Sequence, residues 1–206
     1  MKVELRELSV NDGMDVYEMI EEIGLGENGF TTNFPEHDYE SFQAKLPRLL
    51  EHSKGIDLPE GYVPQTIYWL YINDKPVAYG KLRHHLNEKL MEYGGHIGYI
   101  VRPSERSKGF GTLFLRELIK AAKSKGISRL LLTCNEDNQR SRKVIENNHG
   151  KLETVTNGIC SYWIELRIAE RHMNFIQSVG FEITGYRFTK KIESLVNDRG
   201  FTYAAY

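Results

Sequence analysis

The chain has 206 residues, of which 40% are hydrophobic and 11% aromatic, so it is long and apolar enough for one α/β domain with a sizeable core. Its 27 lysines and arginines are balanced by 28 aspartates and glutamates, and the net charge of -1 argues against a general nucleic-acid-binding protein. No apolar run approaches the roughly 20 residues of a membrane span, which argues against a transmembrane helix.

Two cysteines, Cys134 and Cys160, are too few for a disulfide framework and fit a reducing compartment. The first residues are charged and alternate in polarity, unlike a signal peptide. We therefore expect a cytoplasmic protein that has neither nucleic acid nor a membrane as a partner.

The N-terminal part of the chain predicts one strand and two helices. Residues 3–8 alternate between polar and apolar side chains, as in a strand with one buried face. Apolar residues at helical spacing predict a helix over residues 14–23, with Ser9 or Asp12 as its N-cap. A second amphipathic helix is expected over residues 39–50.

A β-hairpin is expected after these helices. Residues 66–72 form an apolar run typical of a strand, residues 73–75 supply turn chemistry, and residues 76–84 form the returning strand. Before the hairpin, Pro47 is expected to interrupt the second helix. After it, residues 87–94 are polar and are expected to form an irregular crossing to the next strand.

The middle of the chain predicts a strand, a tight turn and a helix. Residues 96–102 are mostly β-branched, aromatic or small and favour a strand. Pro103 ends it because proline has no N–H for a sheet ladder. After Gly111, apolar residues recur at helical spacing as far as Ala122, and Gly126 follows as a helix stop.

The turn before this helix has the features of an anion site. Unpaired backbone N–H groups and the positive end of the helix dipole meet at a helix start. Gly109 and Gly111 allow a bulky ligand to approach the backbone because they carry no Cβ, and Arg106 and Lys108 add positive charge. A pyrophosphate fits this arrangement, and a plain tight turn into a helix explains the two glycines as well.

Further α/β structure is expected after the central helix. Residues 128–134 predict a strand that is buried on both faces. Asn138 or Asn135 caps a short helix behind it. Two strands follow over residues 151–156 and 159–166, and the Asn-Gly pair between them is a strong hairpin signal.

Two common phosphate-binding motifs do not fit the turn. The chain has no G-x-x-x-x-G-K-[ST], and the dinucleotide fingerprint requires a third glycine where Leu113 and Phe114 stand. Residues 106–111, Arg-Ser-Lys-Gly-Phe-Gly, instead resemble motif A, [R/Q]-x-x-G-x-[G/A], of the GNAT family of acetyl-CoA-dependent N-acetyltransferases. The resemblance continues through the strand at residues 129–133 and through residues 138–141.

The resemblance implies an α/β fold with a mixed, mostly antiparallel central sheet, a splayed parallel pair at its centre and helices on both faces. It also implies an acyltransferase that moves an acetyl group from acetyl-CoA to an amine by direct attack in a ternary complex. Residues 1–166 would form this domain. Residues 167–206, with a helix, a strand and a helix expected at 169–179, 181–188 and 190–197, would extend it and cover the acceptor site or a homodimer interface.

The resemblance assigns a set of residues to acetyl-CoA. The strand backbone is expected to bond the pantetheine and polarise the thioester carbonyl, and the turn with the helix start is expected to hold the pyrophosphate. These residues are Tyr99, Ile100, Val101, Arg106, Ser107, Lys108, Gly109, Phe110, Gly111 and Thr112. Asn138 and Ser141 match the family's contact beside the pantetheine arm, and an ordinary N-cap role explains Asn138 as well.

Ile145 stands where many members of the family carry a tyrosine that protonates the departing thiolate. Isoleucine has no proton to donate, so the usual acid is missing from this position. Tyr99, Tyr162 and Cys134 are the candidate substitutes. A tyrosine introduced at residue 145 is expected to be tolerated.

His96 is the leading candidate for the base, because an imidazole with a pKa near 6.5 takes up protons at neutral pH. Glu92 is the alternative, acting directly or through a water molecule. A purely structural role for His96 beside Gly94 and Gly95 competes with the catalytic one.

Residues 83–87 and 94–99 form the elements RHxLN and GGHIGY, which look like marks of a subgroup of the family. Their clustering makes Arg83, His85 and Asn87 candidates for the acceptor pocket, and a solvated strand end is the alternative for all three.

Other functions stay open at this point. A CoA-binding regulatory module with little turnover differs from the enzyme in releasing no thiol, and a transferase of another acyl group differs in its donor. No metal is expected, because no H-E-x-x-H or cysteine pair supports His84, His85 and His96 as ligands. Cys134 has no adjacent base that would make it a nucleophile.

Overall fold

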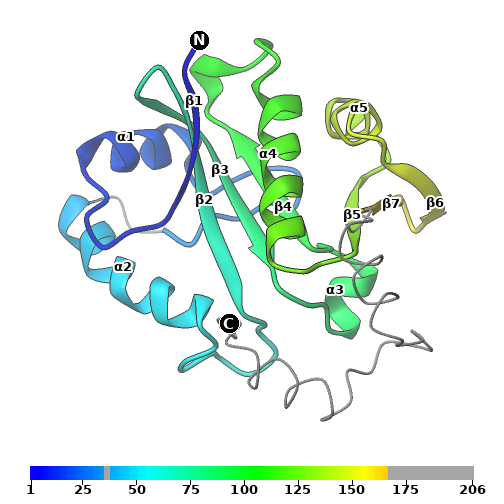
Figure 1. The fold of residues 1–206 in the computed structure, drawn as a ribbon, viewed down its shortest axis with the longest axis horizontal. Helices are drawn as coiled ribbons and strands as arrows, with labels where there is room; N and C mark the ends of the chain where they lie inside the picture. Colours follow the sequence, from blue (N-terminus) through cyan, green and yellow to red (C-terminus); the bar gives the residue numbers. More distant parts are fainter. Residues whose placement is uncertain (35–37, 167–206) are drawn as a thin grey trace, which may run out of the picture. The chain divides into compact units, whose positions relative to one another are not determined.

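The computed structural model describes residues 1–34 and 38–166 of the chain (Figure 1). The helix, strand and helix expected from residue 169 onward lie outside the described residues. The division of the chain into residues 1–166 and an extension over residues 167–206 stays a prediction.

The first sheet has four antiparallel strands in the order β1-β2-β3-β4. They are β1 (Val3–Glu7), β2 (Gln65–Ile72), β3 (Lys75–Arg83) and β4 (Ile97–Val101). The hairpin of β2 and β3 confirms the expected one, and almost all its residues are buried because helices cover both faces of the sheet. Figure 1 shows α1 and α2 on one side of these strands and α4 on the other.

The second sheet has three strands in the order β5-β7-β6, also antiparallel. They are β5 (Arg129–Asn135), β6 (Lys151–Thr156) and β7 (Ile159–Glu165). Asn157 and Gly158 join β6 to β7 with φ angles of 51° and 74°, the left-handed pair that this hairpin turn needs. The expected hairpin is confirmed. Before it, α5 (Gln139–Asn147) begins after Asn138, whose side chain accepts a hydrogen bond from the Ser141 N–H.

One face of the first sheet is covered by α1 (Met14–Ile23) and α2 (Tyr39–Ser53). Their apolar sides pack on Trp69, Tyr79 and Ile100 of the sheet. Trp69 is fully buried, and its indole nitrogen still has a partner, because Nε1 donates to Asp12 Oδ2 at 2.7 Å. This face therefore combines aromatic packing with a satisfied polar atom.

Two details at the start and middle of these helices differ from expectation. The N-cap of α1 is Gly13, which makes no side-chain hydrogen bond, so the predicted cap by Ser9 or Asp12 is wrong. The Asp12 carboxylate is engaged instead by the Ser9 N–H and by Trp69. The predicted interruption at Pro47 is also wrong, because α2 continues through this residue. A buried side chain, Leu46, anchors the helix beside the proline, which removes only one backbone donor.

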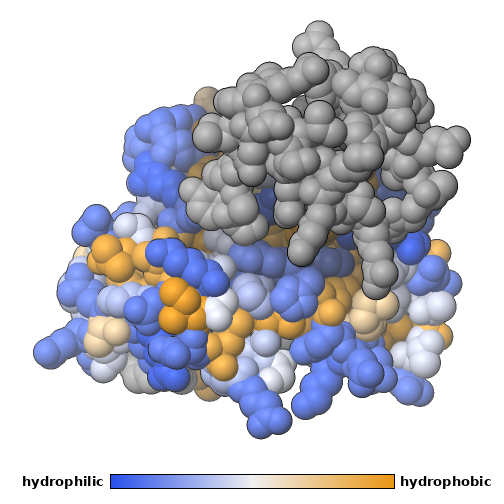
Figure 2. Space-filling model, turned by 60° about the horizontal axis from the view of Figure 1, so that its bottom comes forward, coloured by the Kyte–Doolittle hydropathy of each residue, from blue (hydrophilic) through white to orange (hydrophobic). Residues whose placement is uncertain are grey.

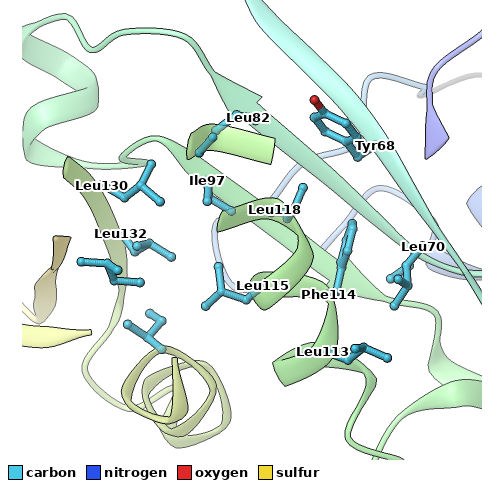
Figure 3. Packing of buried hydrophobic residues seen from close by; sticks show 14 of the residues in the cluster. Tyr68, Leu70, Leu82, Ile97, Leu113, Phe114, Leu115, Leu118, Leu130 and Leu132 are labelled. Atoms are coloured by element: carbon cyan, nitrogen blue, oxygen red, sulfur yellow. The ribbon is translucent and has the colours of Figure 1, made fainter. Parts of the chain in front are cut away.

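The opposite face is covered by α4 (Phe110–Ser124), whose apolar side joins the two sheets. Figure 3 shows Phe114, Leu115 and Leu118 of α4 among leucines of β2, β3 and β5. These three α4 side chains are fully buried, and each contributes about 1.5–3 kcal/mol on the transfer scale. Gly80 of β3 makes the close packing possible, since a Cβ there would lie 2.7 Å from Phe114.

A glycine turn joins the two sheets at one end of β4. Gly95 has a φ of 58°, and a Cβ on it would lie 2.4 Å from the Leu131 carbonyl oxygen of β5, so only glycine fits. The His96 N–H then donates to that carbonyl at 2.7 Å, and the Leu131 N–H donates back to His96 Nδ1 at 3.0 Å. In the described part of the chain, β4 and β5 share no ladder beyond these bonds and belong to separate sheets.

The polar crossing before β4 contains one element that the sequence pattern does not predict. This is α3 (Glu88–Glu92), a single short turn of helix capped by the side chain of Asn87. Between α4 and β4 the chain adds η1 (Pro103–Glu105), a 3₁₀ turn that begins at the proline expected to end the strand.

Among the described residues no helix is long and apolar enough to cross a membrane. On the part of the surface coloured by hydropathy in Figure 2, hydrophobic residues are interspersed with hydrophilic ones.

Candidate active site

A pocket of about 700 Å³ lies along β4 and reaches both faces of the first sheet. This volume is within the range of small-molecule sites, roughly 300–1,000 Å³. On one side it is lined by the turn before α4, the end of β5 and the start of α5. On the other side it is lined by the loop that follows α1 and by the end of β3. The two sides meet at β4.

The turn into α4 has the backbone of an anion cradle. Gly109 is the N-cap residue with a φ of 81°, and Ser107 has a φ of 62°. No heavy atom lies within 4 Å of a Cβ built on Gly109, so the space in front of the turn is open. The first N–H groups of α4 have no partner within the helix and face this space with the positive end of the dipole.

Charged side chains around the turn are held by acids. Arg106 pairs with Glu27 of the loop after α1 at 2.9 Å, and its Nε donates to the Val101 carbonyl at 3.1 Å. Lys108 pairs with Glu105 at 2.7 Å. Of the residues that the sequence assigns to acetyl-CoA, Lys108 alone lies outside the pocket lining; the others line it.

The backbone of β4 presents donors to the pocket edge. The Arg102 N–H donates to the Val77 carbonyl of β3. In a strand, the N–H and C=O groups of every second residue point to the same edge. Arg102 points toward β3, so Tyr99 and Val101 point their N–H and C=O groups to the edge of β4 away from β3. The Val101 carbonyl meets Arg106 there, as noted above. The Tyr99 and Val101 N–H groups are therefore placed to bond a ligand that lies between β4 and β5.

Of His96, Glu92 and Tyr99, the main catalytic candidates, Tyr99 lines the pocket in the described structure. Its hydroxyl lies 3.4 Å from Ser141 Oγ of α5. Burial raises the pKa of Tyr99 above its usual value, so the hydroxyl keeps its proton at neutral pH. Cys134, at the end of β5, also lines the pocket, and burial raises the pKa of its thiol to about 11.

His96 and Glu92 lie outside the pocket lining. Burial, with the nearby charge of Arg83, lowers the pKa of His96 to about 4, and its Nδ1 is occupied by the Leu131 N–H. Glu92 is exposed at the end of α3. Neither side chain therefore lies in the pocket that Tyr99 lines. The role of either as a base stays a prediction.

Tyr162, the remaining candidate acid, is buried in the core and lies outside the lining. Its hydroxyl donates to Glu146 Oε1 at 2.8 Å and accepts from Arg142 Nε at 3.1 Å. Ile145 is 1% exposed and packs in the same core, whereas its neighbour Val144 lines the pocket. The burial of Ile145 argues against the expectation that a tyrosine at this residue is tolerated, and the expectation stays untested.

The acceptor candidates separate into one that reaches the pocket and two that do not. Arg83 lines it, and its Nη1 donates to the Gly94 and Gly95 carbonyls at 3.0 and 2.9 Å. Asn87 caps α3 and donates to the Gly61 carbonyl. His85 lies with His96 along a separate shallow hollow. Both are outside the pocket lining.

Lys81 is one of the pocket residues that the sequence reasoning misses. It is 7% exposed, lies two residues before Arg83 on β3, and lines the pocket beside Phe30. The sequence contained a signal for this residue. A lysine within an otherwise apolar strand indicates a charged side chain that is buried on one face of the sheet.

The part of the chain that the structure describes has no group of three or more His, Cys, Asp or Glu side chains that could hold a metal ion.

Comparisons with known proteins give the context for this pocket. The model of the acetyltransferase (GNAT) family matches residues 28–150. No curated protein matches the sequence significantly.

Three similar solved structures have low sequence identity and therefore support the fold. RimL, a ribosomal L7/L12 α-N-protein acetyltransferase in complex with coenzyme A, is 19% identical with a TM-score of 0.59, over 81% of this chain and 95% of that one. An acetyltransferase from Salmonella typhimurium that modifies the N-terminal serine of L7/L12 is 19% identical with a TM-score of 0.56, over 81% and 96%. The Campylobacter jejuni N-acetyltransferase PseH in complex with acetyl coenzyme A is 13% identical with a TM-score of 0.54, over 81% and 100%.

Proposed function

Because the chain belongs to the acetyltransferase (GNAT) family and is an acyltransferase, we propose that it moves an acetyl group from acetyl-CoA to an amine by direct attack in a ternary complex. One observation carries this proposal. The pocket is continuous from the anion cradle at α4 to the opposite face of the sheet, so donor and acceptor have separate sides that meet at β4. Two reactants held in this way need no covalent enzyme intermediate.

The donor side is proposed to take acetyl-CoA. The N–H groups at the start of α4 and the side chain of Arg106 hold the pyrophosphate, with Gly109 leaving the path open. Asn138 and Ser141 at the start of α5 lie beside the pantetheine arm. The similar structures of RimL and PseH contain coenzyme A and acetyl coenzyme A, which supports this choice of donor.

The chemistry is proposed to centre on β4. An outward N–H of Tyr99 or Val101 donates to the thioester carbonyl oxygen and stabilises the negative charge that develops there. The amine attacks the carbonyl carbon, the carbon–sulfur bond breaks, and the departing thiolate takes a proton. Tyr99 is the proposed donor, because the residue lines the pocket, its hydroxyl lies beside Ser141, which also lines it, and its raised pKa keeps it protonated.

The proton released by the amine needs an acceptor. His96 and Glu92 stay the sequence-based predictions for this role. The contacts of His96 favour a positioning role, since the Leu131 N–H already occupies Nδ1 and a pKa of about 4 makes the ring a weak base at neutral pH.

The test combines two measurements on the full chain. Calorimetric titration with acetyl-CoA is expected to show saturable binding. A free-thiol assay across a broad amine panel is then expected to show CoA release that depends on one class of amine. Binding without release from any amine would instead favour a CoA-binding regulatory module. Absence of binding would contradict the assignment of the donor side.

A further inference from the structure

A buried cation, Lys81, and a half-buried one, Arg83, face the acceptor side of the pocket. Lys81 and Arg83 are two residues apart on β3, so their side chains share one face of the sheet. Lys81 lies opposite Gly98 of β4 in the strand register, and Phe30 from the loop after α1 packs against Gly98. Both cations line the pocket.

These two cations contact carbonyl oxygens, and Lys81 also lies near aromatic rings. Lys81 Nζ donates to the Thr31 carbonyl at 2.6 Å and lies 5.2 Å from the centroid of the Phe30 ring. Arg83 donates to two glycine carbonyls of the turn before β4. Within the described ranges, residues 1–34 and 38–166, neither cation has a carboxylate partner among its recorded contacts.

Neighbouring cations differ in this respect. Arg106 is paired with Glu27, Lys108 with Glu105, and Arg102 with Glu22. These pairs are more exposed than Lys81, which is the cation that most needs a counter-charge. Among the described pocket residues, Arg140 and Lys143 of the α5 side also have no acid partner, but both are exposed, so Lys81 differs from them in being buried without a counter-charge.

Burial of a cation without a counter-ion is unfavourable. Burial, together with the charge of Arg83, lowers the pKa of Lys81 to about 7. Burial also lowers the pKa of Arg83. An ammonium has three N–H donors, and one is used here by Thr31. An anion on a ligand would supply the missing charge and accept the remaining donors.

The donor side does not supply that anion. In the proposed function the pyrophosphate lies at the start of α4, which covers the other face of the sheet. Successive residues of β4 point to opposite faces, so Gly98 and Lys81 belong to the face away from Tyr99. The thioester that would reach β4 is neutral. The anion must come with the acceptor.

We propose that the acceptor is an amine that also carries a carboxylate, and that Lys81, supported by Arg83, binds the carboxylate while the amine reaches the β4 edge. This inference rests on the proposed function. Two free donors on one singly charged ammonium match the two oxygens and single charge of a carboxylate. A phosphate dianion would need further donors.

The experiment uses amines in matched sets that differ in one group: α-amino acids, their amides, and their phosphonate analogues. Thiol release from acetyl-CoA gives kcat/KM for each. The carboxylates are expected to exceed the amides by at least about tenfold, the scale of one charge-assisted hydrogen-bonded contact. Equal values for acid and amide, or a preference for the phosphonate, would overturn the proposal.

Two variants assign the effect to Lys81. Lys81→Met keeps an unbranched side chain that is one atom shorter and removes the charge, so it is expected to abolish the preference for carboxylates while leaving the Kd for acetyl-CoA within about twofold. Lys123→Met, on the exposed side of α4, is the matched control and is expected to retain the preference. Lys81→Gln serves if the methionine variant does not fold. Retention of the preference in a folded Lys81 variant would contradict the assignment.

A failure of the proposed function gives a different result. If no amine releases thiol, calorimetry with CoA-saturated wild-type protein still compares the binding of each acid with its amide. Selective binding of the acid supports the carboxylate site without catalysis. Absence of both selective turnover and selective binding overturns the site itself.

Discussion

Gly109 and Gly126 lie at the two ends of α4 and have nearly the same backbone, with φ angles of 81° and 78°. A Cβ built on either meets no heavy atom within 4 Å. Alanine at either position therefore carries the same left-handed strain, about 1–2 kcal/mol. The two residues differ in location, because Gly109 lines the pocket and Gly126 does not.

This pair separates ligand binding from stability. Gly109→Ala is expected to weaken acetyl-CoA binding at least tenfold, because its methyl group enters the path of the pyrophosphate. Gly126→Ala is expected to lower the free energy of unfolding by about 1–2 kcal/mol, as Gly109→Ala also does, and to leave the Kd for acetyl-CoA unchanged. Calorimetry and urea unfolding check both. Equal affinity in the two variants would contradict the anion cradle at α4.

Tyr99→Phe tests the proposed acid. Loss of the hydroxyl is expected to lower kcat by about 10²-fold with little effect on the Kd for acetyl-CoA, since general acids contribute roughly 10²–10⁴. Tyr162→Phe is the matched control, because that hydroxyl bonds Glu146 and Arg142 in the core. It is expected to reduce stability and to preserve kcat. An unchanged kcat in Tyr99→Phe would remove this residue from the mechanism.

Ile145→Tyr is expected to destabilise the protein by about 1–3 kcal/mol, because a larger side chain must fit a position that is 1% exposed. Ile145→Val keeps the shape of the packing and is expected to cost about 0.5–1.5 kcal/mol. Urea unfolding of both variants measures the difference. A tyrosine variant as stable as wild type would show that residue 145 has room to turn toward the pocket.

For single residues, the sequence predicts a place in the pocket where that place follows from the spacing of a local motif. Gly109, Gly111 and Asn138 sit in a motif with a fixed geometry, and the structure places them around the pocket. The position of Lys81 depends instead on which face of β3 is covered, which is set by α1 and α2 far away in the chain. Ile145 is a second example. It is buried in the core while its neighbour Val144 lines the pocket, and the sequence pattern does not show which of the two faces the pocket.

His96 links the two sheets, and its titration is expected to affect stability. In the unfolded chain its pKa is near 6.5, and in the folded protein burial lowers it to about 4. Between these values the unfolded state binds a proton that the folded state does not, so the free energy of unfolding falls as pH falls from about 6.5 to 4. The loss can reach about 3 kcal/mol.

His96→Gln is expected to flatten this pH dependence. Chemical unfolding of wild type and variant between pH 4 and 7 measures the difference in slope. The same slope in both proteins would contradict the buried, neutral imidazole. Turnover of the variant at pH 7 also tests the catalytic hypothesis, because a base in the reaction would lower kcat well beyond the change in stability.

Most strands and helices of the described chain are predictable because their apolar residues recur with the period of a strand or of a helix. The β2–β3 hairpin and the Asn157-Gly158 turn are examples with strong local signals. The short α3 has too few residues to show a period. The cap of α1 and the continuity of α2 at Pro47 depend on tertiary partners, Trp69 and the packed side of α2, which local patterns do not contain.

At the scale of the whole described domain, function follows from the separation of the two sheets. The sequence resemblance predicts a central sheet with a splayed pair. In the described residues, β4 and β5 belong to different sheets, and the backbone hydrogen bond between their segments joins His96, just before β4, to Leu131 of β5. The pocket runs along the free edge of β4, and in the proposed function each reactant takes one of its two sides.

Initial-rate kinetics test this account most directly. Thiol release is measured while acetyl-CoA and a reactive amine are varied together. We expect double-reciprocal lines that intersect, because both reactants occupy the pocket before the acetyl group moves. Parallel lines would show that the acetyl group first passes to the enzyme, and would contradict direct attack across β4.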